Sequence, residues 1–169
     1  MSGVLEISKA NGVHHQLSKL AGDWEGTTKV WFEPDKISDE SPVKGKMRLI
    51  LEGRFILHEY SGSFGGKPLE GMMIIGYHLG LEQYQSAWID SYHNGTAIMF
   101  SEGKRNDPAF SMLGDYAYVT PEMEQHWGWR TEFEFVNEDE IIIRAYNISP
   151  EGEETLATET HYKSKAVSS

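Results

Sequence analysis

The chain has 169 residues, of which 39% are hydrophobic and 24% charged, enough to build the core of one globular domain. The formal net charge of −11 argues against a nucleic-acid partner, because an acidic surface repels phosphate. The lack of cysteine excludes disulfides, thiolate metal sites and cysteine catalysis. No apolar stretch is long enough to span a bilayer and the first residues lack a secretory pattern, so we expect a soluble cytoplasmic protein without a membrane partner.

Helical periodicity is confined to the start of the chain. Apolar residues at positions 13, 17 and 20 predict a short helix over residues 13–20, closed by Gly22. We expect residues 1–12 to be an N-terminal tail, residues 13–165 to be the single domain, and residues 166–169 to be a C-terminal tail.

Ten segments rich in β-branched and aromatic residues follow the helix. They span 23–33, 44–52, 54–63, 69–78, 83–91, 95–103, 109–119, 127–137, 139–148 and 154–164. A meander of ten strands exposes two edges unless it closes, so the sequence predicts an all-β fold, a closed antiparallel up-and-down barrel. We expect a polar loop over residues 35–42, and an irregular stretch over 121–126 that forms a lid or a partner contact.

Alternation along the strands predicts which side chains point inward. Trp129, Thr131 and Phe133 alternate with charged residues, and this apolar face is assigned to the interior. The same assignment places Phe55, Leu57 and Glu59 inside, and it puts Trp88 and Asp90 on one face of their strand. Residues 72–75 are apolar on both faces, which predicts that the helix or the second subunit of a homodimer covers the outer face.

Several motifs resemble a known family. Gly22-Asp23-Trp24 after a helix is similar to the Gly-x-Trp start of calycins (lipocalins, fatty-acid-binding proteins and nitrobindin-like barrels), in which the tryptophan plugs one end of the barrel. A wider set resembles the bacterial domain-of-unknown-function family 1579 over about residues 17–164: LAGDWEG (20–26), GRFILHEY (53–60), LEG (69–71), IGY (75–77), SAWIDS (86–91), SEG (101–103) and ETHY (159–162). The resemblance implies a calycin-like barrel and no established activity. His78 departs from the family pattern, where Asp is expected.

Five side chains are the candidate ligand-binding residues: Glu59, Trp88, Asp90, Trp129 and Thr131. A buried carboxylate needs a hydrogen-bond donor or a raised pKa. Glu59 is therefore either functional, as a ligand anchor or general base, or structural, as a carboxylate hydrogen-bonded within the barrel. Alternatively, a one-residue bulge turns its side chain outward. Trp88 beside Asp90 gives an aromatic wall with a polar end, which orients a ligand, although the pair also suits core and turn-capping roles.

Four functions fit these features. The main hypothesis is a barrel that binds a small, partly apolar or aromatic molecule in its interior. The second is a hydrolase-like enzyme with Glu59 and Asp90 as an acid–base pair. The third, which rests on the likeness to nitrobindin-like barrels, is a haem or gas-binding protein that uses His161. The fourth is an interaction module without a ligand. The seven histidines show no metal-ligand spacing, so neither a metal site nor another cofactor is predicted.

Overall fold

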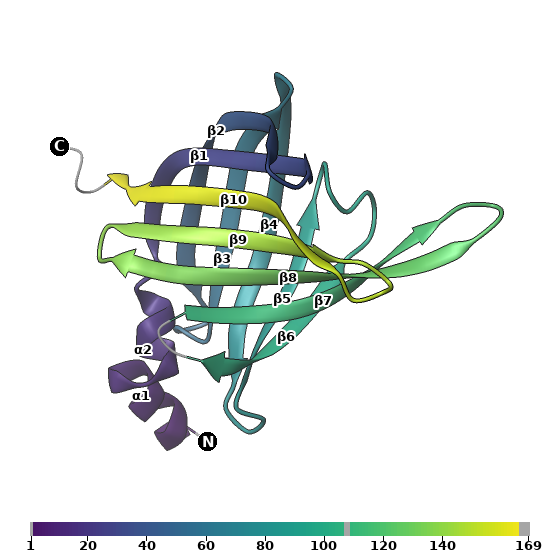
Figure 1. The fold of residues 1–169 in the computed structure, drawn as a ribbon. Helices are drawn as coiled ribbons and strands as arrows, with labels where there is room; N and C mark the ends of the chain where they lie inside the picture. The colour runs from purple at the N-terminus through teal and green to yellow at the C-terminus, as the bar shows by residue number, and fades with distance from the viewer. Residues whose placement is uncertain (1, 107–108, 166–169) are drawn as a thin grey trace.

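The computed structural model describes residues 2–106 and 109–165, and in these residues two short helices precede ten strands (Figure 1). The helices are α1 (Ser2–Asn11) and α2 (Val13–Ser18). The strands are β1 (Gly22–Glu33), β2 (Lys36–Ile50), β3 (Phe55–Phe64), β4 (Lys67–His78), β5 (Gln83–Asp90), β6 (Met99–Asn106), β7 (Ala109–Val119), β8 (Glu124–Asn137), β9 (Glu140–Ile148) and β10 (Glu154–Ser164). Neighbouring strands pair antiparallel and β1 also pairs with β10, which confirms the closed up-and-down barrel.

Two expectations about local structure differ from the fold. The polar loop predicted over residues 35–42 is wrong, because a tight turn with Asp35 at a φ of 63° leads directly into β2 at Lys36. Helix α1 occupies most of the segment expected to be an N-terminal tail, and the expected C-terminal tail over 166–169 lies outside the described residues. The stretch over 121–126 lies at the tip of the β7–β8 hairpin, which projects from the barrel in Figure 1.

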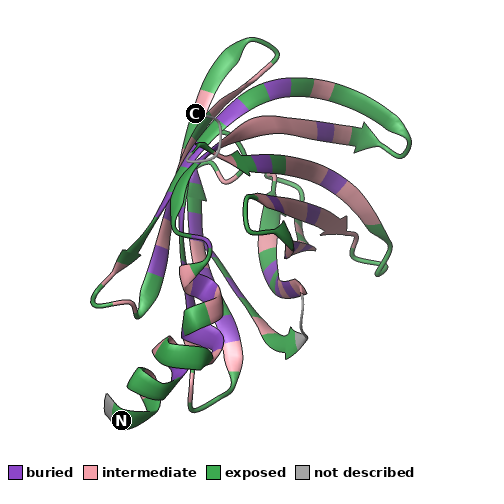
Figure 2. Cartoon of the chain, turned by 90° about the vertical axis from the view of Figure 1, so that its left-hand side faces the viewer, coloured by how far each residue is buried: buried purple, intermediate pink, exposed green. Residues whose placement is uncertain are grey.

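Helix α2 and the start of β1 close one end of the barrel. Val13 and Leu17 of α2 are buried together with Leu20. Figure 2 shows buried, purple segments where the second helix meets the strands. The indole Nε1 of Trp24 donates a hydrogen bond to the carbonyl of Leu20 at 2.8 Å, and its ring lies beside Tyr162. The tryptophan therefore ties the helical cap to the barrel wall.

The interior next to this cap is filled by rings. Edge contacts lead from His14 on α2 to Tyr77 and on to Tyr84. Tyr84 stacks on Phe110 with ring centroids 4.2 Å apart, and Phe110 stacks on Phe133 at 4.9 Å. Ring pairs at these distances stabilise a core beyond the burial of their area. Aromatic rings therefore occupy the interior of the barrel next to the cap.

The inward phase predicted for β3 is wrong. Ile56 and His58 are buried at 0% and 6% exposure, whereas Phe55, Leu57 and Glu59 lie on the outer side of the strand. Alternation did not decide the matter because both phases of this strand carry apolar residues. The preceding turn over residues 51–53, in which all three residues have positive φ, sets the register.

The outer face of β4 stays open to solvent. Met73 and Ile75 point inward, while Met72 and Ile74 are 39% and 43% exposed. The helices cap a barrel end and leave these two side chains exposed, so the expected cover by a second subunit stays a prediction, which gel filtration at several concentrations tests.

Candidate functional site

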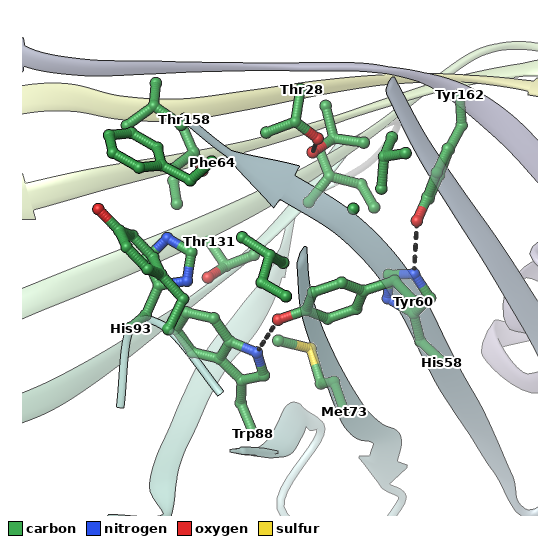
Figure 3. A pocket seen from close by; sticks show the side chains of 18 of the residues that line it. Thr28, His58, Tyr60, Phe64, Met73, Trp88, His93, Thr131, Thr158 and Tyr162 are labelled. Atoms are coloured by element: carbon green, nitrogen blue, oxygen red, sulfur yellow. Dashed lines mark hydrogen bonds between the residues drawn. The ribbon is translucent and has the colours of Figure 1, made fainter. Parts of the chain in front are cut away.

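A cavity opens into the barrel at the end away from the helical cap. Its volume is about 100 Å³, and most of its wall is apolar or aromatic. The lining includes Val30, Val43, Met73, Phe64, Trp88, Trp129, Phe133, Ile143 and Ala145, with polar groups from Thr28, His58, Tyr60, His93, Thr131, Thr158, Thr160 and Tyr162 (Figure 3). Concave, mostly apolar sites with a few convergent polar groups are where proteins bind small molecules.

Two tryptophans form the aromatic part of the wall. The rings of Trp88 on β5 and Trp129 on β8 are stacked, with centroids 5.7 Å apart and planes 23° apart. The imidazole of His93, which follows β5, lies 5.4 Å from Trp88 and 6.0 Å from Trp129. Three planar groups thus meet at the mouth of the cavity, and such groups stack favourably on a flat ligand.

The Asp90 carboxylate is the common acceptor of a hydrogen-bond network behind this wall. Its carboxylate is fully buried, and Oδ1 accepts the backbone N–H groups of Tyr92, His93 and Asn94. Oδ2 accepts the Tyr60 hydroxyl at 2.7 Å and lies 2.6 Å from His93 Nδ1. Asp90 therefore fixes both the turn after β5 and the orientation of the His93 imidazole.

The surroundings of Asp90 keep it ionised. Burial by itself raises the pKa of this carboxyl, but the hydrogen bonds that it accepts from the side chain and backbone of His93 and from the Tyr60 hydroxyl outweigh burial and lower the pKa to about 2. Burial and the nearby Asp90 charge raise the pKa of Tyr60 far above its ordinary value, so this phenol remains a donor. The Tyr60 oxygen also accepts the indole N–H of Trp88 at 2.8 Å, which completes the chain from Trp88 to Asp90.

Gly71 makes the bond between Tyr60 and Asp90 sterically feasible. The three residues lie side by side on β3, β4 and β5, with Gly71 in the middle. A Cβ at Gly71 would lie 2.3 Å from the Tyr60 hydroxyl oxygen and 2.6 Å from the Asp90 Cβ. The missing side chain therefore leaves the space through which Tyr60 reaches across one strand.

A second polar pair lies deeper in the barrel. His58 Nε2 and the Tyr162 hydroxyl are hydrogen-bonded at 2.9 Å, and they also meet over a glycine, Gly45. Burial lowers the pKa of His58 to about 4, so its imidazole is neutral at neutral pH. Burial likewise raises the pKa of Tyr162. This pair is a neutral donor–acceptor pair, not a charged one.

Four of the five sequence candidates meet at this cavity. Trp88, Trp129 and Thr131 line it, and Asp90 lies directly behind the lining through Tyr60 and His93. Their role in binding remains a proposal.

Glu59 is the exception among the five. Its side chain is 39% exposed on the outer face of β3 and forms an ion pair with Arg48 at 3.2 Å. The interior carboxylate pair of Glu59 and Asp90 therefore does not form. The charge of Glu59 is solvated and paired outside, which removes the cost that burying it would impose.

His161 also differs from its hypothetical role. It is exposed on β10, and its Nε2 lies 2.5 Å from Glu140 Oε2 on the neighbouring strand. An outward imidazole tied to a carboxylate cannot reach a group in the interior, so the haem hypothesis based on His161 is wrong. Within residues 2–106 and 109–165, no group of three or more His, Asp or Glu side chains is arranged to hold a metal ion.

Sequence reasoning missed His93, Tyr60 and His58. The side chain of His93 is only 23% exposed and packs on the tryptophans. The spacing of three residues between Asp90 and His93 could have identified His93 as a neighbour of Asp90. A carboxylate that caps a turn accepts hydrogen bonds from N–H groups two and three residues later. Tyr60 and His58 were missed because the phase of β3 was inverted.

The comparisons with known proteins agree with this fold. The sequence matches the family described as "Protein of unknown function (DUF1579)" over residues 9–164, and the chain belongs to that family. No curated protein matches the sequence significantly. Among solved structures, the S-type phycobiliprotein lyase CPES from Guillardia theta matches with a TM-score of 0.58 and 10% identity, covering 95% of this chain and 96% of that one. At this identity the match shows a shared barrel fold alone. None of the helices in the described part of the chain is long and apolar enough to cross a membrane.

Proposed function

We propose that this protein binds a small, partly apolar molecule inside its barrel, with the ligand against Trp88 and Trp129 and its polar group toward His93 and Thr131. The observation that carries the proposal is an open, mainly apolar cavity at whose mouth one imidazole is held by a buried carboxylate. Core residues in a purely structural barrel fill their interior, as the rings next to the helical cap do here.

Fluorescence of 1-aminonaphthalene, a neutral apolar probe, tests the proposal. Saturable 1:1 binding to the wild-type protein is expected. Ala145 is 5% exposed and lines the cavity, so Ala145→Phe should fill it and abolish binding. Ala117→Phe adds the same ring to an exposed position of β7 and should leave binding unchanged.

Circular dichroism shows whether each variant folds, and Ala145→Leu provides a smaller step if Ala145→Phe does not. Folded Ala145 variants that bind the probe as tightly as the wild type would contradict the proposal, as would a wild type that binds neither this probe nor toluene, which has a single ring.

A further inference from the structure

One imidazole nitrogen at the mouth of the cavity has no hydrogen-bond partner among the described residues. Tyr60 uses its proton on Asp90 and its oxygen on Trp88, and Asp90 accepts five hydrogen bonds. His93 Nδ1 is held by Asp90, but in the part of the chain that the structure describes its Nε2 has no hydrogen-bond partner. A ligand at the mouth of the cavity therefore meets His93 Nε2, a nitrogen whose orientation Asp90 fixes.

Asp90 determines what this nitrogen offers. An ionised carboxylate only accepts hydrogen bonds, so Nδ1 of His93 must carry the proton in the bond to Oδ2. In a neutral imidazole with Nδ1 protonated, Nε2 presents a lone pair. The backbone N–H groups of residues 92–94 hold the Asp90 carboxylate in place. Because the carboxylate is fixed beside Nδ1, the turn selects the tautomer with the proton on Nδ1. When the imidazole is neutral, Nε2 thus accepts a hydrogen bond from the ligand.

The charges around the cavity disfavour an anionic ligand. None of the described residues that line it is lysine or arginine. Asp90 lies just behind the wall, and the whole chain carries a net charge of −11. A carboxylate or phosphate placed here would lose water without gaining a cation, which is costly.

The size of the cavity limits the ligand to about one ring. A dry cavity of roughly 150 Å³ holds one benzene molecule. The cavity here measures about 100 Å³ and opens to solvent, so a single ring fits with its polar edge at the mouth. Trp88 and His93, both labelled in Figure 3, and the neighbouring Trp129 offer flat surfaces for that ring.

We infer that the ligand is a neutral aromatic molecule of about one ring that carries a hydroxyl or N–H donor, as a phenol does, and donates it to His93 Nε2. This inference rests on the proposed function and names its ligand class.

Calorimetric titration with matched ring compounds tests the inference. p-Cresol has a hydroxyl donor, 4-fluorotoluene replaces that hydroxyl with a fluorine of similar size, and 4-methylbenzoate carries an anionic group. Wild-type protein should bind p-cresol about 10-fold more tightly than 4-fluorotoluene, which is the usual effect of one neutral hydrogen bond. It should bind 4-methylbenzoate more weakly than p-cresol.

Two variants examine whether the preference depends on His93. His93→Phe keeps a ring and removes the acceptor, so it should bind p-cresol and 4-fluorotoluene equally. Asp90→Asn can donate to Nδ1 and so reverse the tautomer, which should also abolish the preference. His161→Phe makes the same change on the outer face and should keep the 10-fold preference. The ¹⁵N spectrum of the wild-type imidazole reports the tautomer directly if His93→Phe does not fold.

The outcomes separate this inference from the proposed function. Equal affinity of the wild type for p-cresol and 4-fluorotoluene, a preference that survives in His93→Phe, or tighter binding of 4-methylbenzoate overturns the inference. Binding of the naphthalene probe without binding of any single-ring compound also overturns it, while the proposed function stands. Failure of the probe as well overturns both.

Discussion

Replacing Asp90 with asparagine should destabilise the barrel by an amount that depends on pH. The asparagine amide resembles a protonated carboxyl group that cannot ionise. The free energy of unfolding lost at neutral pH therefore equals the free energy by which the folded state favours the ionised form of Asp90 over the protonated form. The pKa of Asp90 falls from the ordinary 3.8 to about 2 on folding, which corresponds to about 2.5 kcal/mol at pH 7. Because the folded-state pKa is the lower one, this stabilisation is complete above the unfolded-state value and disappears as the pH falls through about 2.

Urea unfolding followed by tryptophan fluorescence measures this effect. The stability gap between the wild type and Asp90→Asn should be about 2.5 kcal/mol at pH 7 and should shrink to about half at pH 3. Asp23→Asn, an exposed change on β1 with the same loss of charge, should show almost no gap at either pH. Either of two results would refute the role of Asp90 as an ionised hydrogen-bond acceptor that stabilises the fold. One is a difference in free energy of unfolding between the wild type and Asp90→Asn below about 0.5 kcal/mol at pH 7. The other is a difference that does not shrink in acid.

Three further predictions concern His58, Gly71 and Glu59. Burial lowers the pKa of His58 to about 4 in the folded protein, so between pH 6.5 and pH 4 the unfolded chain takes up a proton that the folded protein does not. The free energy of unfolding should therefore fall by up to about 3 kcal/mol as the pH is lowered from 6.5 to 4. Urea unfolding of His58→Gln should show a smaller fall over the same pH range. Gly71→Ala places a methyl group 2.3 Å from a hydroxyl oxygen and should cost about 1–3 kcal/mol in thermal unfolding, whereas Gly62→Ala, whose nearest neighbour is at 3.4 Å, should cost nothing; equal melting temperatures would contradict this. Glu59→Gln breaks only an exposed ion pair with Arg48, so it should change the stability by less than about 1 kcal/mol and leave probe affinity as in the wild type; weakened binding would show that Glu59 acts on the site after all.

Local sequence features were sufficient for the barrel and for part of its site. The ten segments with β-branched and aromatic residues match the ten strands to within a few residues, except at β2, whose polar first half looked like a loop. The clean alternation from Trp129 to Phe133 placed Trp129 and Thr131 inside correctly, because only one phase of that strand is apolar. Trp88 and Asp90 share the inward phase of β5, because residues two apart on a strand point to the same face.

The sequence by itself determined that this chain forms a closed, acidic β-barrel, because strand propensity, period-two alternation and turn residues act over neighbouring positions. Only the tertiary structure decided which face of β3 points inward, since both phases are apolar and the turn before the strand sets the register. It also decided that Asp90 is partnered by Tyr60 and His93 and not by Glu59, because that network depends on three strands aligned in register and on a glycine that leaves room between them. Contacts of this kind join residues far apart in the chain, so no local pattern encodes them.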